Sequence, residues 1–526
     1  MFATTSQVAR ATLACAVFVS GCALETAEES DESGASEADE VTASESQALF
    51  HKTTQYRLVR GAEYKGHSTH PTGAARWYMP TVVKDQNGDG KNELMLGQPY
   101  GVGANPNRQG AVRILSGADL SELQVISPDD VDSEYDGTFG YSAHSLGDLN
   151  HDGKTDFAIG SSTLRVRNPD GTLGPNDVTG ATWLLKSNNG GGYDVSRILG
   201  DDPSGFFGYW MTTVTLALPS FLRHGAPGAP WRAATNAMPV LGLVSSQAKF
   251  RAGRAWGIEP RTETVAYKAS DDAANNDTIS ERRGYFIAPA GDINRNGFTD
   301  FVMTANGQWI ASDPDPRRYA GRVYFHDGLT GDLIRAVEGA HDLQFLGYRS
   351  GAAAIDDVDD DGVDDFLVGS GRDGVVSGLA GAGVAYVVSG RAIRESTDKV
   401  LRISEHPEIV LRTHPGPRAG ASFGDSIVNL FDMDGDGVDE YAIGALAYGT
   451  ATAANTGGIF IYSGATGQLV QTVEGETAGV YLGQQLLSDP VNGVLYAVDP
   501  YFPDTNGKSI GRVTILRAEP FDPANP

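Results

Sequence analysis

Five short acidic segments recur along this chain, and each leads directly into an apolar run. They read "DQNGDGKNE", "DLNHDGKTD", "DINRNGFTD", "DVDDDGVDD" and "DMDGDGVDE", and they begin at Asp85, Asp148, Asp292, Asp357 and Asp432. Successive starts are 63, 144, 65 and 75 residues apart, and the second interval is twice 72. A unit without the acids is therefore expected near residue 220. Similar flanking sequences after Asp432 indicate one more acid-free unit, so the period predicts seven repeats.

Each repeat is expected to contain four short strands. The unit around the second acidic segment has them as "FGYSAHSL", "FAIGSS", "ATWLL" and "YDVSRIL", with the acids between the first two. Glycine supplies 66 of the 526 residues and lies between such apolar runs, which favours tight turns. A four-stranded blade cannot bury both faces alone, so repeats of this length stack radially. The chain is therefore predicted to be all-β, a seven-bladed β-propeller.

A spare strand before the first repeat offers a way to close the ring. The segment "QYRLVRG", residues 55–61, precedes the first unit, whereas the Pro-rich end of the chain after Leu516 lacks an outer strand for the last unit. Pairing of the N-terminal strand with the last blade would hide two open sheet edges. The propeller is thus expected to span residues 51–518, with residues 519–526 as a C-terminal tail.

The acidic segments carry oxygen ligands at the spacing that a calcium loop needs. Positions 1, 3, 5 and 9 bear carboxylate or amide groups, and Gly at position 6 permits a turn that aims the carbonyl of position 7 inward. Hard oxygen ligands at this density select calcium. Position 12 of the second loop is Ile159 rather than Glu, so the loops belong on β-hairpins and are not EF-hands. The predicted ligands, position 7 included, are Asp85, Asn87, Asp89, Lys91, Glu93, Asp148, Asn150, Asp152, Lys154, Asp156, Asp292, Asn294, Asn296, Phe298, Asp300, Asp357, Asp359, Asp361, Val363, Asp365, Asp432, Asp434, Asp436, Val438 and Glu440.

Turn chemistry gives an alternative, because Asp-Gly and Asn-Gly sequences form Asx-turns without any ion. If the loops do bind calcium, up to five sites are expected, and the number of carboxylates in each loop is expected to rank them from strongest to weakest. At positions 1, 3, 5 and 9, the loops from Asp357 and Asp432 hold four carboxylates, those from Asp85 and Asp148 hold three, and the loop from Asp292 holds two and is the weakest. The ions are expected to be structural, because no base or nucleophile adjoins their ligands.

The sequences that flank the acidic loops resemble the FG-GAP repeats of integrin alpha-chain propellers. The segments "TFGYS", "FFGYW", "FLGYR", "SFGDS" and "YLGQQ" carry the resemblance, which covers residues 55–516, while "RWYMP" and "RGYFI" depart from it. The resemblance implies that the calcium loops lie on the lower face and that ligands meet the upper face. Long loops there offer Trp309, Arg317, Arg318 and Tyr319, either as contacts for a partner or as residues that pack locally.

The N-terminus resembles that of an exported bacterial lipoprotein. One Arg, an apolar run over residues 11–19 and the ending "VSGC" resemble a signal peptide with a lipobox, which implies removal of residues 1–21 and lipidation of Cys22. Residues 23–50 contain no basic residue and cannot bury enough apolar surface to fold, so residues 22–50 are predicted to be a flexible acidic tether. Ala23 rather than Asp after the cysteine implies the outer membrane or the cell surface.

The chain is expected to act as a lipid-anchored binding or adhesion module of the cell envelope, for an extracellular protein or glycan. A formal charge of −27 argues against nucleic acid and suits divalent cations. The histidines are dispersed and no H-E-x-x-H motif is present, so no enzyme is predicted. The alternatives are a structural envelope protein and a calcium-dependent carbohydrate-active enzyme such as a polysaccharide lyase, since some of these enzymes are propellers.

Overall fold

The computed structural model describes most of the chain beyond the N-terminal segment, all of it within the compact unit of residues 47–526. The described residues are 55–66, 78–100, 108–131, 137–165, 179–200, 206–215, 241–246, 253–269, 283–306, 319–507 and 509–521. The predicted signal peptide, tether and lipidated Cys22 lie outside them. Among the described residues, no helix has the length and apolar character needed to cross a membrane.

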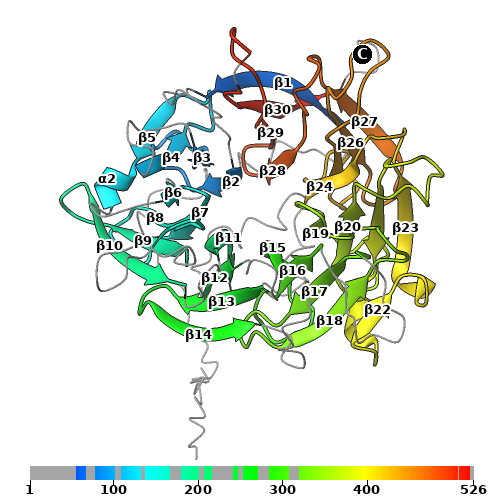
Figure 1. The fold of residues 1–526 in the computed structure, drawn as a ribbon, viewed down its shortest axis with the longest axis horizontal. Coiled ribbons are helices and arrows are strands. Elements are labelled where there is room, and N and C mark those ends of the chain that lie inside the picture. Colours follow the sequence, from blue (N-terminus) through cyan, green and yellow to red (C-terminus); the bar gives the residue numbers. More distant parts are fainter. Residues whose placement is uncertain are drawn as a thin grey trace, which may run out of the picture. The chain divides into compact units, whose positions relative to one another are not determined.

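The strands of this unit pair into seven separate sheets of four or five strands. Within a sheet, neighbouring strands are mostly consecutive in sequence and antiparallel, as hairpin connections require. Figure 1 shows the sheets following one another round a central axis, with β2, β7, β11, β15, β19, β24 and β28 innermost. The all-β class and the propeller arrangement are therefore confirmed.

The strand bounds follow the predicted repeats. The first three sheets contain β2 (Tyr78–Val83), β3 (Glu93–Gln98), β4 (Arg108–Leu115) and β5 (Glu122–Ile126); β7 (Ser142–Gly147), β8 (Asp156–Ser161), β9 (Ala181–Ser187) and β10 (Tyr193–Leu199); and β11 (Phe207–Val214), β12 (Leu241–Ser246), β13 (Arg254–Glu259) and β14 (Thr264–Ala269). The next three contain β15 (Arg283–Pro289), β16 (Phe301–Ala305), β17 (Arg322–His326) and β18 (Leu333–Glu338); β19 (Ala352–Ile355), β20 (Asp365–Ser370), β21 (Val384–Val388) and β23 (Val410–Pro415); and β24 (Phe423–Asn429), β25 (Tyr441–Ala445), β26 (Gly458–Tyr462) and β27 (Leu469–Glu474). The last contains β28 (Gln485–Asp489), β29 (Val494–Asp499), β30 (Arg512–Pro520) and β1 (Tyr56–Lys65).

A few short elements extend this repeat. Strands β6 (Gly137–Phe139) and β22 (Val400–Arg402) pair in parallel with β4 and β18, respectively. Three short helical turns, α2 (Pro128–Val131), α4 (Gly390–Glu395) and η2 (Pro407–Ile409), lie in connections between strands. Strand β22, α4 and η2 all fall between β21 and β23, in the fifth unit along the chain.

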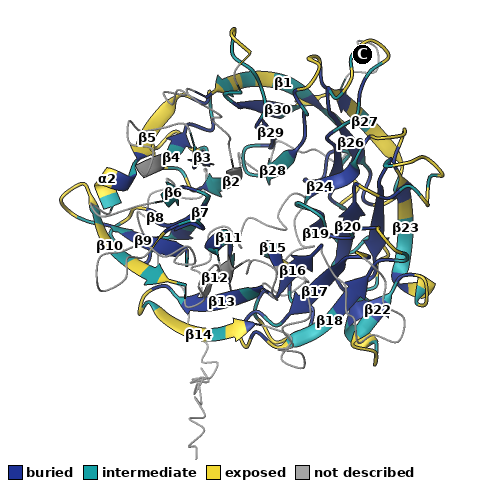
Figure 2. Ribbon diagram, in the orientation of Figure 1, coloured by how far each residue is buried: buried dark blue, intermediate teal, exposed yellow. Residues whose placement is uncertain are grey.

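Burial follows the position of a strand within its sheet. The second strands, such as β3, β8 and β20, are buried along their whole length. The fourth strand is more exposed, and β5 has four exposed residues out of five. Figure 2 shows the buried strands in the middle of the sheets and the exposed outer rim. Both faces of a second strand pack against the neighbouring sheets of the ring, and this accounts for the pattern.

Strand β1 closes the ring as the sequence predicted. It pairs antiparallel with β30, from Tyr56 opposite Pro520 to Lys65 opposite Arg512, and thereby joins the last sheet. Leu58 is 3% exposed in the apolar core that this sheet shares with its neighbour. Strand β30 continues to Pro520, so the tail expected from residue 519 begins later, because these residues pair with the start of β1.

The Phe-Gly signature is explained by how adjacent sheets pack. The residue before the glycine is fully buried, as are Phe207 and Phe423. Gly208 has φ +82°, and a Cβ there would lie 2.5 Å from the carbonyl oxygen of Ala181 in the preceding sheet. The glycine of the preceding second strand, Gly160, would meet the carbonyl oxygen of Gly208 at 2.4 Å. Both glycines are therefore required where two backbones meet.

Candidate metal sites

All five acidic segments lie in the turn between the first and second strands of a sheet. Strand β7 ends at Gly147 and β8 starts at Asp156, so the loop from Asp148 joins them. The other four loops have the same place before β3, β16, β20 and β25. Because each loop follows the innermost strand of its sheet, the five loops lie on one face of the ring.

The aspartate at position 1 organises each loop. Its two carboxylate oxygens accept backbone N–H groups of the glycine at position 6 and of a residue at position 4 or 5, over 2.6–3.0 Å. The glycine at position 6 has φ between +79° and +93° in all five loops. Glycine reaches this conformation without a steric penalty, and that explains its place in the segment.

Positions 3, 5 and 7 continue the turn. The side-chain oxygen at position 5 accepts the N–H of position 7 over 2.9–3.0 Å in every loop. The position 5 residues are Asp89, Asp152, Asn296, Asp361 and Asp436, and their donors are Lys91, Lys154, Phe298, Val363 and Val438. Asn87, Asn150, Asn294 and Asp434 at position 3 accept the N–H of position 5 in the same way. Such bonds form Asx-turns with or without an ion, as the alternative interpretation expects.

Position 9 separates the loops into two kinds. Where it is Asp, both carboxylate oxygens accept backbone N–H groups: Asp156 is bonded by Leu149 at 2.8 Å and by Ser187 at 2.7 Å, and Asp300 and Asp365 are held alike. Where it is Glu, only Oε2 is bonded, by Gln86 to Glu93 and by Met433 to Glu440. The longer side chain thus leaves one oxygen available.

Three unpaired carboxylate oxygens fit a bound cation. Within the described residues, Oε1 of Glu93, Oε1 of Glu440 and Oδ2 of Asp152 are buried and accept no hydrogen bond. Carboxylate oxygens from three acids lie within 4.8 Å of one another in each of three groups, Asp85–Asp89–Glu93, Asp357–Asp359–Asp361 and Asp432–Asp434–Glu440. Buried unpaired charge is costly, and a hard divalent cation would satisfy these oxygens. The residues present therefore fit the expected metal.

Burial raises the pKa of several acids in these loops. Desolvation raises the pKa of Glu93, Asp300 and Asp365 to about 7 each, and nearby carboxylates, including Asp327 beside Asp300, add to the shift. The same causes raise the pKa of Glu440 to about 9. Crowding of like charges in a poorly solvated loop disfavours ionisation, and a cation would reverse the preference.

The loop from Asp292 has an acid that the motif does not contain. Asn294 and Asn296 each donate from Nδ2 to Oδ2 of Asp327, over 2.7 and 2.8 Å. Asp327 follows β17, at a place where other sheets have a serine such as Ser389. The ranking by charge within the motif therefore undercounts this loop. The sequence "HDG" where other repeats have "SG" is the signal that could have revealed it.

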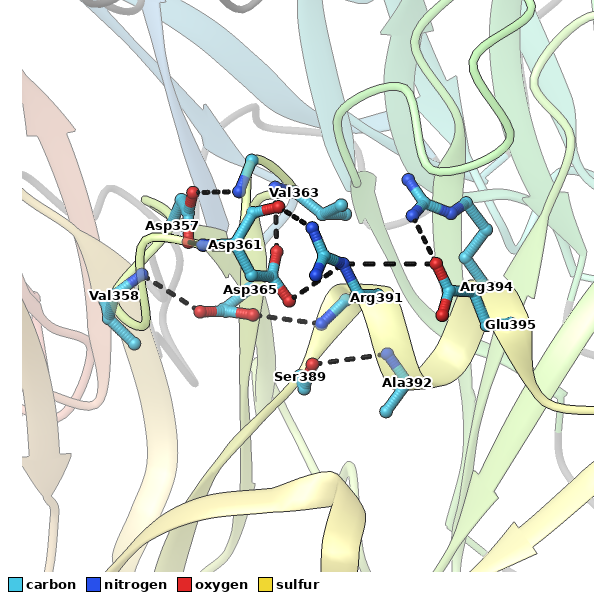
Figure 3. A network of polar contacts seen from close by, with 12 residues as sticks. Asp357, Val358, Asp361, Val363, Asp365, Ser389, Arg391, Ala392, Arg394 and Glu395 are labelled. Carbon is cyan, nitrogen blue, oxygen red and sulfur yellow. Dashed lines mark hydrogen bonds and ion pairs between the residues drawn. The ribbon is translucent and has the colours of Figure 1, made fainter.

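The loop from Asp357 has a cation beside it. Arg391 in α4 donates to the carbonyl oxygen of Asp361, and its Nε lies 3.4 Å from Oδ2 of the same residue. Figure 3 shows the guanidinium next to the loop, with Ser389 capping α4 and Asp365 bonded to Val358. Asp365 also accepts the N–H of Gly390. Arg391 offsets part of the loop's negative charge, so counting four carboxylates overstates the charge available to a metal.

The candidate ligand-binding residues are only partly described. Trp309, Arg317 and Arg318 lie outside the described residues. Tyr319 is 42% exposed, and its ring stacks on Phe345 with centroids 5.4 Å apart. Tyr319 is thus accessible to a partner and also packs locally, so both interpretations of it remain predictions.

One hydrolase-like motif in the sequence is structural. Gly420–Gly424 matches the G-x-S-x-G pattern, with Ser422 in its centre. A nucleophile elbow joins a strand to a helix, whereas this segment leads into the strand β24, which begins at Phe423. The φ of +54° at Ser422 recurs at the equivalent positions Phe345 and Tyr481, at +57° and +62°. The conformation therefore belongs to the repeat.

Comparison with known proteins supports the same class. No protein-family model matches the chain. Integrin alpha-2 from Bos taurus is 24% identical over 192 residues, which cover 35% of this chain and 15% of that protein. The chain therefore matches only a small part of this relative. Together with the propeller arrangement, the similarity supports an integrin-alpha-like propeller.

Proposed function

We propose that this protein is a calcium-stabilised binding module of the cell envelope, for a protein or glycan partner. The distant similarity to an integrin alpha chain supports a binding or adhesion role. The observation that carries the calcium part is the pair of unpaired, buried Glu oxygens at Glu93 and Glu440. Each lies in a group of three acids whose oxygens approach within 4.8 Å. The seven sheets are then seven blades of one ring.

Each element of the loop has a defined task in this proposal. The aspartate at position 1 holds the turn through two backbone N–H groups, and the acid at position 9 ties the turn to the second strand. Calcium supplies the positive charge that these carboxylates lack. A filled loop would thus fix the hairpin between the first two strands. That role is structural and leaves the opposite face for ligands.

The predicted lipid anchor belongs to the same proposal. Lipidation at Cys22 and the acidic tether would hold the propeller at the outer membrane or the cell surface. Labelling with a radioactive fatty acid tests this directly. We expect label in the natural chain and none in Cys22→Ser. Equal labelling of both proteins would reject the anchor without affecting the propeller.

The binding role is tested with immobilised whole cells, extracellular proteins and glycans. We expect retention of the calcium-loaded protein on at least one surface and its release by a chelator. If the protein is retained equally with and without the chelator, binding does not depend on calcium. A protein that binds nothing would favour the structural alternative, and cleavage of an acidic polysaccharide would favour the lyase.

A further inference from the structure

The turns at the Phe-Gly position of the repeat, where the glycine follows Phe, Arg or Leu, place a row of tyrosines at the start of the inner strands. Tyr141, Tyr209, Tyr285 and Tyr348 each follow the glycine of such a turn in four consecutive sheets. These turns lie just before the innermost strand or within its first three residues, and the acidic loops come after its end. The four tyrosines therefore lie at the end of the inner strands opposite the metal loops.

The four rings form one continuous ladder. Centroids are 5.0 Å apart for Tyr141 and Tyr209, 5.9 Å for Tyr209 and Tyr285, and 5.7 Å for Tyr285 and Tyr348. All four side chains are only partly buried. Since the inner strands surround the axis in Figure 1, the ladder follows the inner rim. We name these four tyrosines the tyrosine ladder.

Two arginines stand at one end of the tyrosine ladder. The guanidinium carbons of Arg349 and Arg372 lie 5.4 and 5.0 Å from the ring centroid of Tyr348. Arg372 is exposed. Cations of the chain itself thus already use the face of Tyr348, and a cationic partner would be repelled there. This end suits neutral or acidic groups.

Unpaired acceptors continue the rim in the next two sheets. Asp425 and Gln484 occupy the position after the glycine, where the ladder has tyrosine. They are 4% and 8% exposed, and Oδ1 of Asp425 and Oε1 of Gln484 accept no hydrogen bond within the described residues. The other oxygen of Asp425, Oδ2, is 3.3 Å from Nε of Arg349. Acceptors that are buried and unpaired call for a donor from a ligand.

We propose that this rim binds a hydroxyl-rich glycan, which deepens the proposed binding function and rests on it. Pyranose rings present polarised C–H groups that pack on the electron-rich faces of tyrosines. Sugar hydroxyls donate to Asp425 and Gln484 and accept from Arg372. The site thus combines an aromatic wall with a few placed polar groups, as small-ligand sites do.

The test uses the full calcium-loaded chain on an array of neutral pyranose oligosaccharides and uronate polymers, with an oligoarginine peptide as a third probe. We expect glycan binding that falls about 10-fold or more in Tyr285→Ala and largely persists in Tyr285→Phe, which keeps the ring. Tyr193→Ala is the matched control, because this tyrosine lies on the outer strand β10 and packs on Phe157.

A second variant keeps the proposal testable if Tyr285→Ala fails to fold. Arg372 is exposed and its guanidinium lies over the rings of Phe345 and Tyr348, so Arg372→Ala should melt like the natural protein and lose several-fold affinity, more for uronates than for neutral sugars. Glycan binding that survives both Tyr285→Ala and Arg372→Ala would overturn the rim site and leave the binding function standing. Binding of oligoarginine alone, or of no glycan, would overturn the glycan assignment.

Discussion

At the scale of single residues, the acids at position 9 define the chemistry of the loops. An Asp there is satisfied by two backbone N–H groups, whereas Glu93 and Glu440 each retain a buried oxygen without a partner. An unpaired buried carboxylate destabilises the metal-free fold and stabilises the metal-bound one. The effect is larger at Glu440 than at Glu93, because the pKa of Glu440 is raised to about 9.

Neutralising Glu440 should have opposite effects in calcium and in chelator. Glu440→Gln keeps the shape and the acceptor for Met433 but removes the charge. With calcium, we expect a loss of about 1–3 kcal/mol in unfolding free energy. In chelator, the variant should equal or exceed the natural protein, since no buried charge remains. Urea unfolding measures both, with the exposed Glu519→Gln as control. Equal losses in both buffers would show that Glu440 is not a ligand.

The raised carboxyl pKa values predict how stability depends on pH. Burial raises the pKa of Glu93, Asp300 and Asp365 to about 7 in the fold, against about 4 when unfolded. The folded state therefore binds more protons between these values, so their contribution is present at low pH and is lost as pH rises through 7. In chelator, the melting temperature should be higher at pH 5.5 than at pH 8. Calcium should reduce or reverse this difference. Greater stability at pH 8 in chelator contradicts the account.

At the scale of elements, a contact between two glycine backbones joins the fifth sheet along the chain to the sixth, as Gly160 and Gly208 join the second to the third. The Phe-Gly glycine of one sheet packs on the second strand of the preceding one. Gly424 has φ +93°, and a Cβ there would lie 2.5 Å from the carbonyl oxygen of Val384. Gly369 of the preceding second strand would meet Gly424 at 2.2 Å. The repeat signature is therefore a packing requirement as well as a turn.

A pair of alanine substitutions separates packing from backbone strain. Gly424→Ala should lose more than about 2 kcal/mol, because it combines a positive φ with a clash against backbone. Gly420→Ala shares a positive φ, +71°, but has nothing within 4 Å, and should lose only about 1 kcal/mol. Urea unfolding of both variants gives the comparison. Similar losses would mean that the tight contact contributes nothing.

Much of this architecture could be predicted from the sequence, because period and motif are local properties. The acidic loops, their place between the first two strands and the closing strand β1 all follow from spacing. Neighbours supplied by other elements could not be predicted. Asp327 and Arg391 are distant from the motif in sequence, and only the fold brings them to the loops. The tyrosine ladder needs the ring itself, since its members come from four sheets.

At the scale of the whole molecule, closure joins the two ends of the described chain. Arg512 of β30 bonds to Glu63 of β1 at 2.8 Å and to Asp499 of β29 at 2.7 Å. Its guanidinium also lies 4.4 Å from the ring centroid of Phe502. Together with the buried Leu58, these contacts connect an N-terminal strand to the last sheet. A ring held this way should unfold as one unit.

Truncation tests the closure. A chain that begins at residue 51 should melt like the full chain, because the predicted tether cannot pack. A chain that begins at residue 67 lacks β1, exposes an edge of β30 and should melt at a much lower temperature. Leu58→Ala offers a milder version, with an expected loss of about 2–5 kcal/mol. If the two truncated chains have the same melting temperature, the ring is closed in some other way.

The most direct test of the account is thermal unfolding of the whole protein with calcium and with chelator. Ions that bind only the folded state stabilise it by about 2.7 kcal/mol for each site at 100 times the dissociation constant. We expect a clear rise in melting temperature with calcium and an unchanged all-β circular dichroism spectrum. A melting temperature that is the same in calcium and in chelator would show that the acidic loops are turns and bind no structural ion.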